Sequence, residues 1–194
     1  MKIGVLALQG DFAEHITVLQ RIGVETREVR LAEELKGLDG LIIPGGESTT
    51  IGKLAIDFGL MEPLIQFGEK KPIWGTCAGA ILLSKDAQRE QPLLGLMDIT
   101  VARNAFGRQV DSFEVDLDVS VLDKVDGENQ LFSTVFIRAP LIESADADDV
   151  KVLAALEDGT IVAAQQGHLL ATSFHPELSD DDRFHKYFLT LIES

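Results

Sequence analysis

The first half of the chain alternates between short apolar runs and segments with helical periodicity. Residues 3–8 form a continuous apolar run that ends at Gln9 and Gly10, which is typical of a strand buried on both faces. Beyond Asp11, a candidate N-cap, apolar residues recur at steps of three and four, which predicts a helix with one buried face. The apolar positions of this helix are Phe12, Ile16, Leu19 and Ile22. The alternation continues with predicted strands over residues 25–30, 40–44 and 71–75. Predicted helices cover residues 47–58, a further stretch that ends at residue 68, and residues 78–84.

The second half of the chain consists mainly of short strand-like runs separated by turn residues. The tripeptide Glu157-Asp158-Gly159 suits a tight hairpin, so we expect several of these strands to be antiparallel. A last helix follows residues 179–182, whose aspartates suit a helix N-terminus, and it carries Phe184, Phe188 and Leu191 on one face. The predicted strands of this half cover residues 99–103, 112–119, 134–138, 151–156, 160–165 and 169–174.

These elements predict the fold class. Strands that alternate with helices through short loops imply crossover connections and a mostly parallel sheet covered by helices, to which the second half adds antiparallel strands. The chain has 194 residues and contains neither an internal repeat nor a low-complexity linker. We therefore expect a single α/β domain over residues 1–194.

Composition and charge exclude several classes of function. The 32 acidic residues outnumber the 17 lysines and arginines, and the net charge of −15 would repel a phosphate backbone, so we expect no nucleic-acid binding. A single cysteine excludes an internal disulfide and a cysteine-rich metal site. No apolar run approaches the ~18 residues of a membrane span. We expect a cytoplasmic protein that binds no membrane and no metal.

The strongest chemical signal is Gly75-Thr76-Cys77-Ala78-Gly79, which follows a predicted strand and opens a predicted helix. Glycines on both sides of a central nucleophile permit the sharp turn of a nucleophile elbow, which exposes the central side chain above the sheet. A buried core thiol is the alternative, since free cysteines are often buried. The strand–turn–helix context favours Cys77 as a nucleophile.

A nucleophilic cysteine needs a base, and the chain has four histidines. We expect His15 and His185 to be half-exposed on helices, and His168 lies in a turn without an evident carboxylate partner. His175 ends the last predicted strand, and Pro176 favours an extended backbone before it. Side chains two residues apart in an extended segment share a face, so Glu177 is expected to orient the imidazole. A solvated strand-end turn is the alternative.

The loop Pro44-Gly45-Gly46-Glu47-Ser48 also follows a predicted strand. Its glycines allow backbone N–H groups to approach a ligand, so Gly46 and Ala78 are candidate donors of an oxyanion hole. The alternative is a plain turn with Ser48 as an N-cap. The elbow, the histidine segment and this loop all follow predicted strands, and open α/β sheets bind ligands at the carboxyl ends of their strands. This convergence favours an enzyme.

The chain resembles the triad-type, or class I, glutamine amidotransferases over nearly its whole length. The elbow and the His-Pro-Glu segment are shared across that family. Further segments narrow the resemblance to the glutaminase subunits of pyridoxal 5′-phosphate synthase. These segments are Gly45-Gly46-Glu47-Ser48-Thr49-Thr50, Arg103-Asn104-Ala105-Phe106-Gly107-Arg108-Gln109 and Phe136-Ile137-Arg138-Ala139-Pro140. The resemblance implies a three-layer, flavodoxin-like fold with a mostly parallel central sheet and additional antiparallel strands.

The resemblance also implies the reaction and the roles of residues. Cys77 would attack the side-chain amide of L-glutamine and form a glutamyl thioester, His175 would transfer the protons, and Glu177 would hold the imidazole. Independently of the resemblance, arginines at predicted strand ends suit the α-carboxylate of an amino acid. The implied glutamine-binding residues are Gly46, Glu47, Ser48, Arg103, Ile137 and Arg138.

The implied partner is the synthase, or lyase, subunit of pyridoxal 5′-phosphate synthase, which would receive the ammonia within a hetero-oligomer. The glutaminase chemistry requires no cofactor. Three alternatives stay open: an amidotransferase that feeds another synthase, a flavodoxin-like cysteine hydrolase, and a non-catalytic regulatory subunit. We further expect residues 123–130 to form a surface excursion and the aspartates at 180–182 to raise the pKa of His175.

Overall fold

Strands and helices alternate through the first half of the chain in the computed structural model, which describes residues 1–103, 112–127, 130–145 and 147–193. The α-helices are α1 (Phe12–Arg21), α2 (Ser48–Asp57), α3 (Met61–Gly68), α4 (Ala78–Leu83), α5 (Asp123–Asp126) and α6 (Arg183–Thr190). The 3-10 helices are η1 (Ala32–Leu35), η2 (Ser120–Leu122) and η3 (Pro176–Leu178). The strands are β1 (Lys2–Leu6), β2 (Glu25–Val29), β3 (Gly40–Ile43), β4 (Ile73–Thr76), β5 (Ser84–Asp86), β6 (Met97–Ala102), β7 (Ser112–Leu117), β8 (Phe132–Ile137), β9 (Leu141–Ser144), β10 (Val150–Ala155), β11 (Ile161–Gln166) and β12 (Leu169–Thr172).

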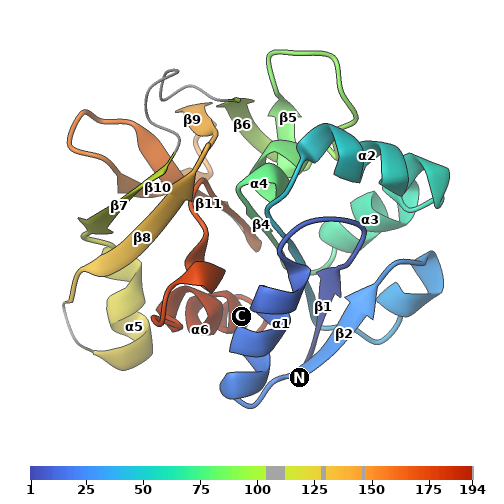
Figure 1. The fold of residues 1–194 in the computed structure, drawn as a ribbon, viewed down its shortest axis with the longest axis horizontal. Helices are drawn as coiled ribbons and strands as arrows, with labels where there is room; N and C mark the ends of the chain where they lie inside the picture. The colour runs from blue at the N-terminus through green and yellow to red at the C-terminus, as the bar shows by residue number, and fades with distance from the viewer. Residues whose placement is uncertain (104–111, 128–129, 146, 194) are drawn as a thin grey trace.

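The main sheet has the order β2-β1-β3-β4-β12-β11-β9-β6-β5, and β10 pairs with β11 (Figure 1). The strands from β2 to β12 are parallel to one another, in the order of a flavodoxin-like sheet. Pairs among β12, β11, β9 and β6 are antiparallel, and β7 with β8 forms a separate antiparallel pair. The predicted fold class is confirmed, and so is the hairpin between β10 and β11.

Two hydrophobic clusters lie on opposite faces of the sheet, because successive side chains of a strand point to opposite sides. In β3, Leu41 and Ile43 belong to the cluster that includes α2, α3 and α4, whereas Ile42 belongs to the cluster of α1 and α6. In β4, Ile73 and Trp74 divide between the two clusters in the same way. The chain therefore forms three layers, with helices on both faces of the sheet.

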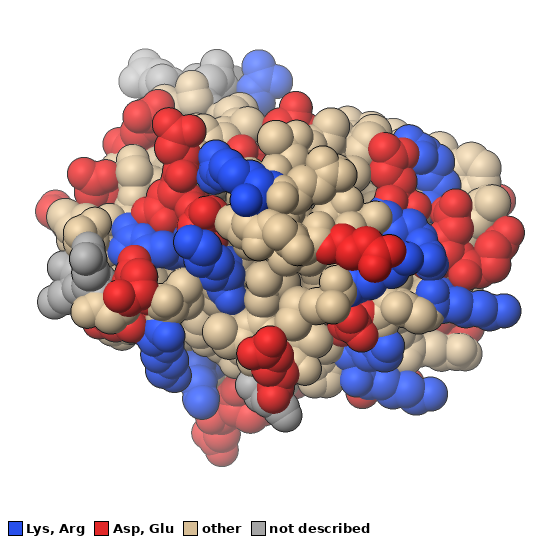
Figure 2. Space-filling model, turned by 90° about the horizontal axis from the view of Figure 1, so that it is seen from below, with Lys and Arg blue, Asp and Glu red and all other residues tan. Residues whose placement is uncertain are grey.

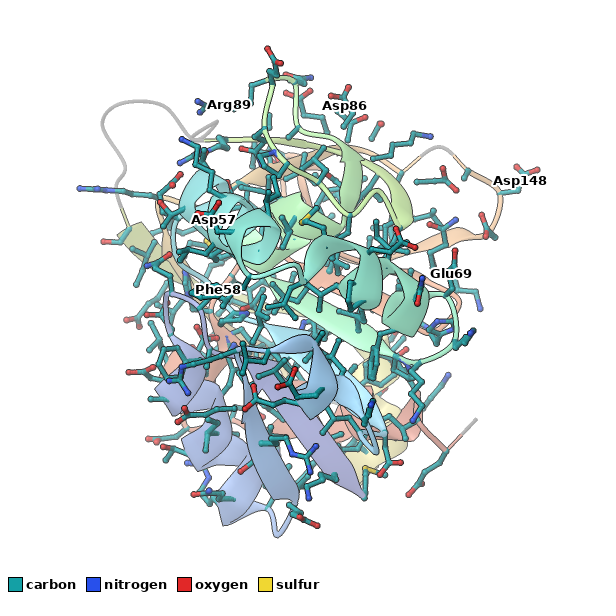
Figure 3. The ribbon with its side chains drawn as sticks, turned by 90° about the vertical axis from the view of Figure 1, so that its right-hand side faces the viewer. Asp57, Phe58, Glu69, Asp86, Arg89 and Asp148 are labelled. Atoms are coloured by element: carbon teal, nitrogen blue, oxygen red, sulfur yellow. The ribbon has the colours of Figure 1, made fainter. Side chains whose placement is uncertain are left out.

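The helices α2 and α3 form the outer layer on one face, which Figure 3 views directly. Asp57 and Glu69 are exposed there, and the ring of Phe58 is 51% exposed. Figure 2 views a different face, on which basic and acidic side chains are interspersed. In the part of the chain that the structure describes, no helix is long and apolar enough to cross a bilayer. The expected cytoplasmic location and lack of nucleic-acid binding stay predictions.

Some local expectations were wrong. The strands β5 and β9 were not predicted, because neither carries an apolar run: β5 reads Ser-Lys-Asp and β9 contains a single buried residue. The expected surface excursion is confirmed for residues 123–127, none of which is buried, although residues 123–126 form the short helix α5. Asp11 precedes α1 but makes no side-chain cap hydrogen bond, and its backbone N–H donates to the carbonyl of Gly45 (3.1 Å). Glu47, rather than Ser48, caps α2 by accepting from two backbone N–H groups.

Candidate active site

Cys77 stands at a sharp turn between β4 and α4. Its φ and ψ angles are 48° and −104°, a conformation that costs a non-glycine residue on the order of 1–3 kcal/mol. The turn requires glycine beyond the cysteine, since a Cβ on Gly79 would lie 2.0 Å from the carbonyl oxygen of Ile43. The first turn of α4 thus packs directly on the end of β3. The predicted strand–turn–helix context of the elbow is confirmed.

His175 follows β12 at the same edge of the sheet. Its backbone N–H donates to the carbonyl of Val135 in β8 (2.8 Å), and the residue is buried. The ring lies against the loop that follows β3, because a Cβ on Gly45 would be only 2.4 Å from His175 Cε1. The missing side chain of Gly45 therefore leaves the space that the imidazole fills.

The carboxylate of Glu177 is hydrogen-bonded to this imidazole, with 2.7 Å between Oε1 and Nδ1. The expected extended geometry was wrong, because residues Pro176–Leu178 form the 3-10 helix η3. The tight turn nevertheless returns the carboxylate to the ring. A second carboxylate oxygen, Oδ2 of Asp11, lies 3.5 Å from the same nitrogen.

Neighbouring side chains control the protonation of His175. Burial alone would lower its pKa, but interactions with the Cys77 and Glu177 side chains outweigh burial and raise the pKa to about 10. Burial raises the pKa of Glu177, although His175 partly opposes this shift. The aspartates that we expected to act on His175 are engaged elsewhere: Asp181 pairs with Arg183 and Asp182 with Lys186. For these two aspartates, ion pairs compensate the charge locally, and the groups that raise the pKa of His175 are Cys77 and Glu177.

A cavity of about 460 Å³ opens above Cys77 and His175. At its edge, Arg103 Nη2 lies 2.8 Å from Glu47 Oε1, and Arg103 Nη1 donates to Thr49 Oγ1 (3.1 Å). Partial burial would raise the pKa of Glu47, but hydrogen bonds from Thr50, Thr49 and Arg103 together lower it to about 2. Glu47 is therefore ionised at any working pH and holds the guanidinium at the cavity. The lining residues are Gln9, Asp11, Gly46, Glu47, Ser48, Cys77, Ala78, Ile81, Arg103, Ile137, Arg138, Pro140, His175 and Leu178.

The structure brings all the predicted site residues to this cavity except Glu177, which lies behind His175. Ser48 is nearly fully buried, and its hydroxyl donates to Gln91 Oε1 (3.3 Å). Residues 104–109 of the arginine-containing motif lie outside the described residues.

Sequence reasoning missed Gln9, whose Oε1 accepts from the backbone N–H of Glu47 (2.7 Å), and Asp11. Both residues follow β1. The rule that open α/β sheets bind ligands at the carboxyl ends of their strands would therefore have identified them.

The site also contains a group of potential metal ligands. Asp11, His175 and Glu177 offer ligand atoms within 4.8 Å of one another. However, the Nδ1 atom of His175 is already bonded to Glu177 Oε1, so this nitrogen carries the shared proton instead of a free lone pair. The arrangement suits proton transfer better than metal binding.

The two helical histidines were placed wrongly by sequence reasoning. His15 and His185 are fully buried, and His15 Nδ1 lies 3.0 Å from His185 Nε2. The sequence spacing indicates that His15 is buried, since it comes three residues after Phe12 and four before Leu19, on the apolar face of α1.

The amino-acid sequence was compared with models of protein families and with known proteins. A model described as the SNO glutamine amidotransferase family matches residues 5–194. The chain belongs to this family. It is 59% identical over 196 residues to "Pyridoxal 5'-phosphate synthase subunit PdxT" of Herpetosiphon aurantiacus, a match that covers 98% of this chain and 100% of the relative. A protein of the same name from Dehalococcoides mccartyi is 58% identical over 199 residues, covering 100% of this chain and 98% of the relative.

Two solved structures agree with this chain in fold. A structure titled "Crystal structure of glutamine amidotransferase" is 50% identical, has a TM-score of 0.91 and covers 99% of both chains. The structure of PurLQS from Thermotoga maritima is 17% identical, has a TM-score of 0.71 and covers 99% of this chain and 96% of its own, so the likeness concerns the fold alone. The family expected from the motifs is therefore confirmed.

Proposed function

We propose that this glutamine amidotransferase hydrolyses the side-chain amide of L-glutamine to glutamate and ammonia. We further propose that it supplies the ammonia to the synthase (lyase) subunit of pyridoxal 5′-phosphate synthase, with which it forms a hetero-oligomer. The observation that carries the reaction is the shared cavity of Cys77 and His175, with Glu177 bonded to the imidazole. The relatives named as subunits of that synthase support the partner.

The proposed reaction begins when His175 takes the thiol proton of Cys77, so that Sγ attacks the carboxamide carbon and the carbonyl electron pair moves to the oxygen. Backbone N–H groups of Gly46 and Ala78 are the proposed donors to that oxyanion. His175 gives its proton to the amide nitrogen, the C–N bond breaks, and ammonia leaves a glutamyl thioester on Cys77. His175 then takes a proton from water, which attacks the thioester, and the C–S bond breaks to release glutamate.

Substrate binding is assigned to the arginine side of the cavity. Ionised Glu47 fixes the guanidinium of Arg103, which can pair in a bidentate manner with the α-carboxylate of glutamine. Arg138 and Ile137 line the same cavity, as do Gly46 and Ser48. The reaction needs no cofactor and no metal.

The rival functions differ in partner or in chemistry. An amidotransferase for another synthase would share the cavity, so only a partner test separates it from our proposal. A general cysteine hydrolase would act on amides without a synthase. A non-catalytic subunit would release no glutamate. The names of the relatives favour the pyridoxal phosphate partner.

The test is glutamate release from L-glutamine by the purified chain, with and without the synthase subunit of the same organism. We expect strong release with the synthase present and none from Cys77→Ala. With an ammonium salt in place of glutamine, the complex with Cys77→Ala should still form pyridoxal phosphate at the wild-type rate, which controls for the activity of the synthase. Release that ignores the synthase would refute the partner, and no release by a folded wild-type complex would refute the reaction.

A further inference from the structure

A chain of buried imidazoles lies behind Glu177, on the side away from the cavity. His15 Nε2 lies 3.1 Å from Thr76 Oγ1 and 3.3 Å from Glu177 Oε2, and only the first contact has hydrogen-bond geometry. His15 Nδ1 lies 3.0 Å from His185 Nε2, and both histidines are fully buried. The indole of Trp74 meets both rings edge-on. No step of the proposed reaction uses these two histidines.

Both imidazoles are neutral. Burial, followed by the nearby His185 and His175, lowers the pKa of His15 well below its ordinary value. Burial and the charge of Arg21 lower the pKa of His185 to about 3. A contact between two neutral imidazoles holds one N–H, so either His15 donates from Nδ1 or His185 donates from Nε2.

The surroundings distinguish these two arrangements. If His15 donated from Nδ1, its Nε2 lone pair would face the Glu177 carboxylate, and His185 would bury an unpaired Nδ1–H. If His185 donates from Nε2, the proton of His15 sits on Nε2, toward Thr76 and Glu177. His185 Nδ1 and Glu177 Oε2 are both buried without a hydrogen-bond partner among the described residues. Because a buried unpaired donor is rarer than an unsatisfied acceptor, and an anion attracts an N–H, the second arrangement is favoured.

We propose that His15 is a positioning residue for Glu177 that presents its Nε2–H to Oε2 of the carboxylate while Oε1 engages His175. This proposal rests on the proposed function, in which Glu177 orients His175. Nδ1 of His175 would then hold one carboxylate oxygen at 2.7 Å, and the Nε2–H of His15 would attract the other across 3.3 Å, which opposes rotation of the carboxylate away from the imidazole. The second N–H also favours the ionised carboxylate, against the burial that raises its pKa.

Substitution of His15 tests the donor. In the complex with the synthase, His15→Met fills a similar volume without an N–H, and we expect kcat for glutamate release to fall about 10–100-fold with KM little changed. His15→Gln places an amide N–H near the position of Nε2 and should recover most of the rate. Wild-type kcat in His15→Met, or equal loss in both variants with unchanged thermal unfolding, would overturn the proposal.

A matched control is available in His168, which lies in the turn between β11 and β12 and contacts the carbonyl of Gly68 (2.7 Å). His168→Gln should leave glutamate release unchanged. If the wild-type complex released no glutamate, the proposed function would fail in the same assay. If the wild type were active, Cys77→Ala inactive and His15→Met fully active, only the role of His15 would fail.

The tautomer gives an independent readout that needs neither turnover nor a variant that folds poorly. Nitrogen NMR of the chain with ¹⁵N-labelled histidine distinguishes a protonated Nε2 from a protonated Nδ1. We expect His15 to carry its proton on Nε2 near neutral pH, with assignment aided by His168→Gln. A proton on Nδ1 would overturn the proposal whatever the kinetics.

Discussion

The contact between Gly45 and His175 gives a sharp prediction for Gly45→Ala. A Cβ at this position would lie 2.4 Å from Cε1 and 2.9 Å from Nδ1 of His175, whereas ordinary contacts begin near 3.4 Å. The imidazole must therefore move by about 1 Å, because the added Cβ is fixed to the backbone and the nearest opposing atoms belong to the ring that Glu177 holds. A displacement of this size at a reacting group costs roughly 10²-fold in rate, or about 2.7 kcal/mol in activation free energy.

The assay is steady-state glutamate release by the complex at saturating glutamine. We expect kcat of Gly45→Ala to fall while the free energy of unfolding changes little. Gly59→Ala is the matched control: Gly59 has a φ of +65° but nothing within 4 Å of an added Cβ. That variant should lose about 1–2 kcal/mol of stability and keep its activity. A Gly45→Ala enzyme with kcat within a few-fold of wild type would refute the argument that glycine makes room for the imidazole.

Three further predictions concern charge. Arg103→Ala should raise KM for glutamine more than it lowers kcat, measured in the same assay, because it removes the guanidinium that Glu47 holds; an unchanged KM would contradict this role. Folding raises the pKa of His175 to about 10, so its protonation stabilises the folded state. This contribution to the free energy of unfolding is complete below pH ~6.5 and is lost as pH rises through about 10. The free energies of unfolding of wild type and His175→Gln, measured in urea, should therefore converge in alkali. Arg183→Ala should lower the free energy of unfolding by about 1–3 kcal/mol in denaturant titrations, since it removes a buried donor to the Leu131 carbonyl (2.8 Å); an unchanged midpoint would refute this.

Much of the site was predictable because it depends on local chain geometry. The Gly75-x-Cys77-x-Gly79 spacing identifies a turn that few sequences can adopt, and the apolar runs before it and before Gly45 identify buried parallel strands. Parallel strands end at the same edge of a sheet, so residues that follow them must be neighbours. This rule predicted the meeting of Cys77 and His175 without any knowledge of their distance.

Other features were not predictable from local patterns. Glu177 reaches His175 through the turn of η3, where an extended segment was expected, and two-residue spacing does not distinguish these cases. The ion pairs of Asp181 and Asp182 were also missed, because their partners lie in the helix that follows and the pairing depends on side-chain geometry.

The sequence by itself determined the alternation of strands and helices in the first half of the chain, the elbow and the residues gathered at the sheet edge, since these follow from hydrophobic periodicity and glycine spacing. Only the tertiary structure decided that His15 and His185 meet behind Glu177. Their contact spans 170 positions in the chain and requires α1 and α6 to pack on the same face of the sheet. Periodicity indicates which face of a helix is apolar, but the partner of that face is fixed by how distant segments pack together.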